Sequence, residues 1–208
     1  MEGNLYYEID PTCHYSCYRF RALLASGIWA QTFNVDSVHS SVEFKVRHMG
    51  ISNIKGSFTD FSGSFAVAGT PARLTALKGT VGIDSIDTHN ENRDKHLRTA
   101  DFFVMDKHPK MTFEMAEFIP AEKGSDGVAR GKLTLLGVTK EVDFAISFGG
   151  IGENRHQQKI CGFSATTVIK RSDYGMKFKK YLKTGEMLVG DAVHITLEIE
   201  GAVPKKEE

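Results

Sequence analysis

Five polar side chains of the types that bind anions, hold metals or transfer protons occur in two stretches of the sequence. They are His39, His48, Arg93, Asp94 and His96. An arginine can grip a phosphate or carboxylate through two parallel hydrogen bonds, and a histidine can exchange protons near neutral pH or bind a metal. One hypothesis places these groups at the mouth of a binding site, where they hold a polar head group. The structural alternative is that they fasten a helix to the rest of the fold.

Signatures of catalysis are missing around these residues. The sequence contains no G-x-S-x-G motif and no Gly-rich phosphate loop, and the histidines do not match the H-E-x-x-H zinc pattern. Of the three cysteines, only Cys161 lies after residue 30, and it is of the kind that packs as a small buried hydrophobe. We therefore expect no catalytic residue, no metal and no cofactor. The alternative is an enzyme that uses the His/Arg/Asp cluster, with or without a metal.

The elements that must position these residues are strands, because apolar side chains alternate with polar ones after Gln31. Val42, Phe44 and Val46, for example, are separated by Glu43 and Lys45. Alternation of this kind also runs through residues 61–67, 77–83, 111–115, 130–135, 142–148, 161–169 and 193–199. Period two is typical of strands with one buried face, and closure of a sheet removes its exposed edges. We predict an all-β fold, an eight-stranded antiparallel up-and-down barrel, with Gly137-Val138 in a type II′ hairpin turn.

The alternation stops between Ser85 and Phe103. His89, Arg93 and His96 recur there at helical spacing, and Asp94 stands four residues before Arg98. Charges at that spacing can pair along a helix. The segment predicts a short helix that bridges two strands and covers one end of the barrel.

Charge and composition exclude some partners. Basic and acidic residues balance at 26 each, so no overall field attracts nucleic acid. Basic residues do gather locally around Tyr174, Phe178 and Tyr181, where they could touch an anionic membrane surface. A solvated loop is the alternative for that segment, and a homodimer is also considered. The basic residues are Lys170, Arg171, Lys177, Lys179, Lys180 and Lys183.

Residues 1–30 differ from the rest and are interpreted as a leader or an extension. Arg19 and Arg21 precede a short apolar stretch that ends at Ala30, which is the order of a secretory signal. The domain is therefore expected to span residues 31–208, and the mature protein to be periplasmic or secreted.

Five ordered segments together resemble the YceI-like, polyisoprenoid-binding family. They read DSVHS (36–40), RDKHL (93–97), LTLLGVTK (133–140), RSDYG (171–175) and LVGDAV (188–193), and the resemblance as a whole covers residues 32–203. Ser37 stands where this family usually has proline. The resemblance implies a lipocalin-like barrel with an interior tunnel, usually in an exported protein, that binds isoprenoid or other long-chain lipids without a cofactor.

Combined with the apolar strand faces, the resemblance predicts a carrier, storage or scavenging protein for a long-chain apolar or amphiphilic lipid. Eight strands enclose a space that side chains can just fill or that can hold one small ligand. A stress-related structural protein with a filled barrel is therefore a further alternative. The candidate ligand-binding residues are Phe44, Phe113, Phe144, Ile146, Phe148, Phe163 and Ile195.

Overall fold

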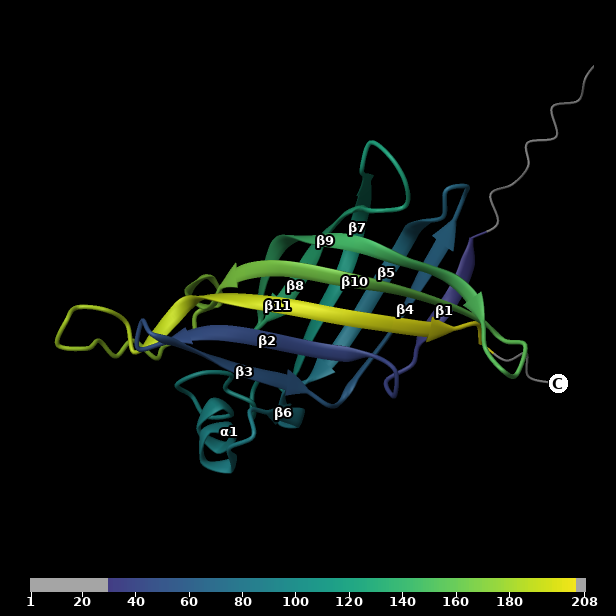
Figure 1. Ribbon diagram of the computed structural model, residues 1–208. Helices are drawn as coiled ribbons and strands as arrows, with labels where there is room; N and C mark the ends of the chain where they lie inside the picture. Colours follow the sequence, from purple (N-terminus) through teal and green to yellow (C-terminus); the bar gives the residue numbers. More distant parts are fainter. Residues whose placement is uncertain (1–29, 205–208) are drawn as a thin grey trace, which may run out of the picture.

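The computed structural model describes residues 30–204, and antiparallel strands form most of them (Figure 1). The strands are β1 Gln31–Val35, β2 Ser41–His48, β3 Ser52–Phe58, β4 Phe61–Ala68, β5 Arg73–Gly82, β6 Ile86–Asp87, β7 Lys110–Pro120, β8 Gly127–Leu135, β9 Val138–Glu153, β10 Lys159–Lys170 and β11 Val189–Ala202. One α-helix, α1 (Glu91–Leu97), and two 3₁₀ turns, η1 (Ile83–Ser85) and η2 (Arg171–Tyr174), complete the described elements. None of the described helices is long and apolar enough to cross a membrane. The leader expected in residues 1–30 lies outside the described part, apart from Ala30.

The sheet closes into a barrel of eight strand positions, as predicted. The hydrogen-bonded order is β1-β4-β5-β7-β8-β9-β10-β11, and β11 returns to β1 through the pair Val35–Gly201. The long strand β11 also pairs with β2, which pairs with β3, which pairs with β6. β1 and β2 are thus two halves of one broken strand, and the same holds for β3 with β4 and for β5 with β6.

The three breaks lie side by side and form a seam in the barrel wall. They fall at residues 36–40, 59–60 and 83–85. Backbone hydrogen bonds keep the wall closed here, from Asp36 N–H to Glu200 O at 2.9 Å, from Thr59 N–H to Ser85 O at 3.2 Å and from Gly82 N–H to Asp60 O at 2.9 Å. The seam changes the direction of three neighbouring strands without opening the sheet.

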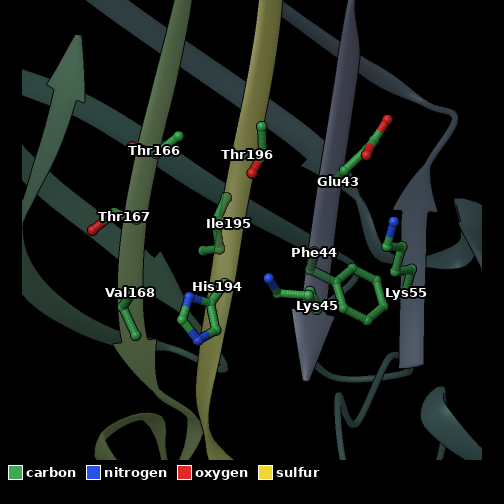
Figure 2. Close-up of a pocket in the computed structure, with 10 residues that line it drawn as sticks. All are labelled: Glu43, Phe44, Lys45, Lys55, Thr166, Thr167, Val168, His194, Ile195 and Thr196. Carbon is green, nitrogen blue, oxygen red and sulfur yellow. The ribbon is translucent and has the colours of Figure 1, made fainter. Parts of the chain in front are cut away.

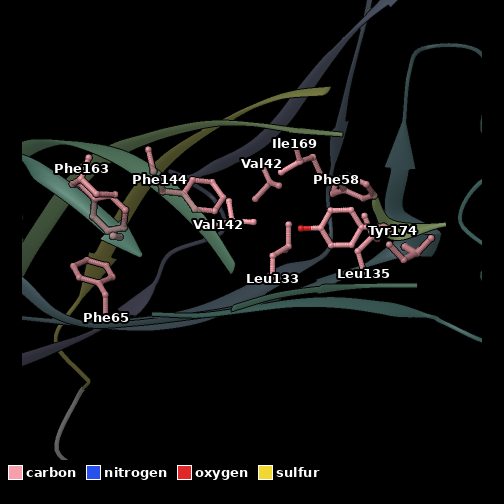
Figure 3. Close-up of a cluster of buried hydrophobic side chains, with 14 of the residues drawn as sticks. Val42, Phe58, Phe65, Leu133, Leu135, Val142, Phe144, Phe163, Ile169 and Tyr174 are labelled. Atoms are coloured by element: carbon pink, nitrogen blue, oxygen red, sulfur yellow. The ribbon is translucent and has the colours of Figure 1, made fainter. Parts of the chain in front are cut away.

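The barrel interior is apolar because the alternation turns one face of each strand inward. Phenylalanine rings fill the end where β1 begins: the centroids of Phe33 and Phe65 are 5.3 Å apart, and those of Phe65 and Phe163 are 5.1 Å apart. Phe113 meets Phe144 edge to face at 5.0 Å. Figure 3 shows how these layers continue toward Tyr174 at the other end. Burial at about 25 cal/mol per Å² makes this interior the main stabilising term.

The hairpin between β8 and β9 differs from the prediction by one residue and by turn type. Leu135 pairs with Val138, so the loop residues are Leu136 and Gly137. Both have positive φ, at 55° and 74°. Two positive φ values define a type I′ turn, whose twist matches that of the flanking strands. The prediction of a type II′ turn at Gly137-Val138 was wrong because Leu136 accepts the left-handed conformation.

The short helix is confirmed, and it lies against the barrel end opposite the phenylalanine cluster (Figure 1). The Asn90 side chain caps it by accepting a hydrogen bond from Arg93 N–H at 3.0 Å. The Arg98 guanidinium does not pair with the Asp94 carboxylate, although the Arg98 N–H donates to the Asp94 carbonyl at 3.2 Å. The guanidinium instead donates to the Asp84 carbonyl at 2.6 Å and 3.0 Å, which joins the C-terminus of α1 to η1.

Candidate ligand-binding cavity

Two apolar cavities lie inside the barrel. The inner chamber has a volume of about 120 Å³ and is bounded by side chains that include Phe61, Leu77, Phe113, Phe144 and Phe163. The helix-side chamber has a volume of about 100 Å³ and lies beneath α1 and η2. Its lining includes Phe44, Phe58, Leu97, Phe103, Met176 and Val189. Both chambers expose almost no polar surface, so they suit hydrocarbon.

Five side chains border both chambers and therefore lie where the two meet. We call these five residues the waist. They are Val42, Met111, Leu135, Ile169 and Ile195. Four of its members are branched aliphatic residues, and Met111 is unbranched and adaptable. A chain that occupied both chambers would have to pass through the waist.

Glycine leaves room in the inner chamber where β4 and β5 face each other. Gly63 pairs with Gly79, and both line this chamber. A Cβ added at Gly79 would meet only the Ser62 carbonyl oxygen, at 3.7 Å, so the position faces open space. A larger residue at position 79 would fill part of the chamber.

Five of the seven predicted apolar residues line the chambers. Phe113, Phe144 and Phe163 border the inner chamber, Phe44 borders the helix-side chamber, and Ile195 belongs to the waist. The other two, Ile146 and Phe148, border neither. They lie further along β9, toward the end that the phenylalanine cluster fills, and Ile146 is buried in the core.

The five predicted polar residues are not brought into one cluster, and none of them lines a chamber. His39 lies in the connection between β1 and β2, whereas His48 ends β2. Arg93, Asp94 and His96 lie on α1. The described part of the chain therefore places these five groups at three separate positions.

Arg93 and Asp94 tie α1 to the residue that follows β6. Arg93 donates to the Thr88 hydroxyl and to the Thr88 carbonyl, both at 2.7 Å. The buried carboxylate of Asp94 accepts from Thr88 N–H at 3.0 Å and from the Thr88 hydroxyl. These contacts match the structural alternative given for the polar residues, in which they fasten a helix to the rest of the fold.

His96 and His39 also bond to neighbouring carboxylates. His96 Nε2 is 2.8 Å from Asp101 Oδ2, and its ring meets Phe102 and Phe178 edge to face. His39 Nδ1 is 2.9 Å from Asp36 Oδ2, and this hydrogen bond raises the pKa of His39 above its usual value. Asp36, His39 and Glu200 could together reach one cation, but all three lie on the outer surface away from the chambers.

Arg171 borders the helix-side chamber, and sequence reasoning named it only within a motif and a basic run. It is 3% exposed, and its guanidinium donates to the carbonyls of Gly190 at 2.9 Å, Phe178 at 2.8 Å and Val189 at 3.0 Å. Burial lowers its pKa from the usual value. The sequence feature that could have singled out Arg171 is its position directly after the alternating strand β10. Its role in joining η2 to β11 depends on tertiary contacts.

Tyr174 follows on the same turn and inserts its ring into the barrel. Figure 3 shows its hydroxyl directed toward Leu133 and Val142. The residue is 2% exposed, and the hydroxyl has no hydrogen-bond partner among the described residues. Burial, together with the nearby charge of Asp173, raises the pKa of Tyr174 to about 12. The hydroxyl therefore stays protonated over the physiological range.

The outer face of the barrel is polar where the inner face is apolar. A groove of about 370 Å³ crosses β10, β11, β2 and β3 on the outside (Figure 2). Lys45 lies opposite Lys55 on one neighbouring strand and opposite His194 on the other, so three basic groups form a row across the groove. Phe44 and Ile195 on the same strands turn inward. The period-two pattern thus places polar side chains on the outer, solvent-facing side of the sheet and apolar side chains in the barrel interior.

Comparison with known proteins identifies relatives over nearly the whole described region. Residues 33–201 match the model of the YceI-like domain. A UPF0312 protein of Staphylococcus epidermidis is 37% identical over 174 residues, which cover 82% of this chain and 97% of that protein. A UPF0312 protein of Staphylococcus aureus strain N315 is 35% identical over the same shares.

Solved structures share the fold. The crystal structure of the Campylobacter jejuni YCEI protein superposes with a TM-score of 0.65 and 32% identity, covering 76% of this chain and 90% of that one. A polyisoprenoid binding domain from Saccharophagus degradans gives a TM-score of 0.61 with 14% identity, covering 84% and 99%. At 14% identity, the similarity to the Saccharophagus domain shows a shared fold and nothing more.

Proposed function

Because the chain belongs to the family of YceI-like domains, we propose that its barrel binds a long-chain apolar or amphiphilic lipid, of the polyisoprenoid class, and acts as a carrier, store or scavenger. The observation that carries this proposal is the pair of apolar chambers inside the barrel. The domain from Saccharophagus degradans that shares this fold is a polyisoprenoid binding domain, which agrees with the proposal.

Affinity in such a site comes from the removal of hydrocarbon from water. Each buried methylene contributes about 0.8 kcal/mol, and no polar contact is required. Selectivity for chain length is therefore gradual, and any chain of suitable width competes. This is the behaviour expected of a carrier or scavenger.

The sizes of the chambers set a condition on binding. The two volumes, about 120 Å³ and about 100 Å³, together fall below the ~300–1,000 Å³ of a usual ligand pocket. A long chain that occupies both chambers therefore needs side chains of the waist to move apart. Met111 can swing aside because its unbranched side chain has three rotatable bonds.

Our proposal includes no chemistry on the lipid. General acid–base catalysis needs groups within hydrogen-bond reach of each other and of the substrate. The side chains of Arg93 and Asp94 form hydrogen bonds with Thr88. His39 lies between β1 and β2 and His48 at the end of β2, away from α1. This separation favours binding over the alternative of an enzyme built on the His/Arg/Asp cluster. One barrel encloses both chambers, so binding as proposed requires a single chain.

We also propose that the protein works outside the cytoplasm, in the periplasm or as a secreted protein. The support is the order of residues 19–30, in which basic residues precede an apolar stretch. Mass measurement of the protein isolated from its own cells tests this, since export by a cleaved leader would remove these residues.

Native mass spectrometry of protein purified from cells tests the proposed function. We expect a species heavier than the bare chain by the mass of one lipid, which extraction with organic solvent removes. A bare mass, together with no uptake of added geranylgeraniol, squalene or a long-chain fatty acid, would overturn the proposal and favour the filled-barrel alternative.

A further inference from the structure

Two surface segments from distant parts of the sequence meet at the barrel end that carries α1. One is the turn between β2 and β3, and the other is the loop of residues 177–188 between η2 and β11 (Figure 1). Met49 N–H donates to the Leu188 carbonyl at 2.9 Å, and Leu188 N–H donates to the Lys180 carbonyl at 2.8 Å. The two segments therefore form one connected surface.

Apolar side chains project from this surface into solvent. Ile51 is 80% exposed, Tyr181 is 62% exposed and Met49 is 39% exposed. The other large apolar side chains exposed in the described region, Val38, Ile119, Ile151 and Val168, lie on other elements. Ile151 and Val168 are on the paired strands β9 and β10, but Ile151 lies opposite Cys161, seven residues from Val168. Exposed apolar residues that occur singly are ordinary, whereas a group of them marks an interaction site.

Four lysines accompany the apolar side chains. They are Lys177, Lys179, Lys180 and Lys183. Arg47 adds a fifth basic group, since its side chain donates to the Gly50 carbonyl. Four acidic residues adjoin the face: Asp191, which accepts hydrogen bonds from Ser172, Glu186 against the turn at Gly50, Asp173 on η2, and Asp101, which is bonded to His96 and whose carbonyl accepts from Phe178 N–H. Because the whole chain has a formal net charge of zero, this local excess of positive charge is an asymmetry of the molecule.

The chemistry of this surface matches one partner, a bilayer that contains anionic lipids. Tyrosine is enriched where membrane meets water, and each basic residue near an anionic leaflet contributes about 1 kcal/mol. Exposed isoleucine and methionine add burial in the acyl boundary. We propose that this loop face, made of Met49, Ile51, Tyr181 and the four lysines, docks on the surface of an anionic lipid bilayer.

The loop face also flanks the cavity. Met176 immediately precedes the loop and Val189 immediately follows it, and both line the helix-side chamber. Docking therefore brings the wall of this chamber to the bilayer, where a lipid chain can leave the membrane and enter the barrel. This transfer rests on the proposed function, whereas docking itself does not.

Vesicle flotation tests the docking. The full chain is mixed with vesicles of phosphatidylcholine alone or with about one-third phosphatidylglycerol, at low and high salt. We expect binding to the anionic vesicles and a loss of binding at high salt, because salt screens exposed charges. Absence of binding to anionic vesicles would overturn the proposal.

Two sets of variants locate the contact. The triple change Lys179→Glu, Lys180→Glu and Lys183→Glu should weaken binding more than tenfold, and Ile51→Ser with Tyr181→Ser should weaken it severalfold. The matched control reverses three exposed charges in other loops and at the start of β10, with Lys123→Glu, Arg155→Glu and Lys159→Glu. Equal loss in the control would mean that the attraction is not specific to the loop face, and the proposal would be wrong.

Lipid uptake in vesicle-free solution separates this proposal from the function. The loop variants should take up geranylgeraniol as the unmodified protein does, while their rate of extraction from anionic vesicles falls. If the unmodified protein takes up lipid but does not bind vesicles, only the docking proposal is contradicted and the proposed function stands. Vesicle binding without uptake contradicts the proposed function and leaves docking intact.

Discussion

Gly63 and Gly79 face each other across β4 and β5, and together they leave open the side of the inner chamber that side chains would otherwise fill. The two positions differ sharply in the space around them. A Cβ at Gly79 meets one atom, 3.7 Å away, whereas a Cβ at Gly63 comes within 2.5 Å of the Lys78 carbonyl oxygen. This difference allows the chamber to be filled at one position and provides a control at the other.

Gly79→Leu should fill the inner chamber and block lipid uptake without harm to the fold. Each 1.4 kcal/mol of lost binding free energy weakens binding about tenfold. We expect the affinity for lipid to fall at least tenfold. The melting temperature should stay constant or rise, because leucine fits a strand better than glycine. Fluorescence displacement and thermal denaturation measure both effects, and unchanged uptake in a folded Gly79→Leu protein would show that lipid does not use this chamber.

The alanine pair at the same two positions tests the geometry itself. Gly79→Ala should leave stability nearly unchanged, whereas Gly63→Ala must displace backbone and should cost about 1–3 kcal/mol in the free energy of unfolding. Urea denaturation of both variants gives the comparison. Equal costs at the two positions would contradict the described packing.

Met111→Ala should join the two chambers, because Met111 belongs to the waist that divides them. A wider passage removes the cost of opening the waist, so affinity should rise for chains long enough to span both chambers. Short chains that fit in one chamber should bind as before. A series of fatty alcohols of increasing length measures this, and a uniform change at all lengths would argue against a waist.

Asp94→Ala should destabilise the fold through the contacts of α1. It removes the acceptor for the Thr88 amide and hydroxyl, and unsatisfied buried groups cost about 1–3 kcal/mol. His39→Ala, on an exposed side chain, should change stability by less than about 0.5 kcal/mol. Lipid uptake by the fraction of Asp94→Ala that remains folded should be normal, whereas loss of uptake in that fraction would assign Asp94 a binding role.

Alkaline pH should destabilise the protein in part through Tyr174. Its pKa is raised from 10.0 to about 12 in the folded chain. Between these values the unfolded chain has lost the proton that the folded chain keeps, so stability falls as pH rises from about 10 and the loss is complete near 12. A shift of about two pKa units corresponds to a loss on the order of 3 kcal/mol in the free energy of unfolding.

Urea denaturation at pH 9 and 11.5 checks this effect. Tyr174→Phe should lose less stability over that interval than the unmodified protein, and it should be at least as stable at pH 7 because it buries no unpaired hydroxyl. Tyr181→Phe, at a 62% exposed position, is the matched control. If the two variants behave alike, the Tyr174 hydroxyl is not buried as described.

The fold followed from the sequence because one signal, alternation with period two, persists along every long strand. The same signal missed β1 and β3, since a segment such as Asn53 to Ser57 is short and has few apolar side chains. Each of the three broken strands has one half that the alternation revealed, in β2, β4 and β5, and one half that it did not reveal, in β1, β3 and β6. That the two halves belong to one strand position follows only from the strand pairing.

The site was less predictable than the fold. Inward-facing phenylalanines such as Phe113 could be named because strand parity decides which face is buried. Parity does not say where along the barrel a void remains, so Ile146 and Phe148 were included although the chambers end before them. Residue type alone grouped Arg93 with His39 and His48, but tertiary contacts turn Arg93 to Thr88 and leave the histidines apart.

A crystal structure with a bound long-chain lipid that carries bromine at both ends of the chain tests the central claim most directly. Anomalous scattering locates each bromine. We predict one bromine near Phe113 in the inner chamber and the other near Phe103 in the helix-side chamber, with the chain passing Met111 between them. Bromine found only on the outer surface, with both chambers unchanged, would contradict the account.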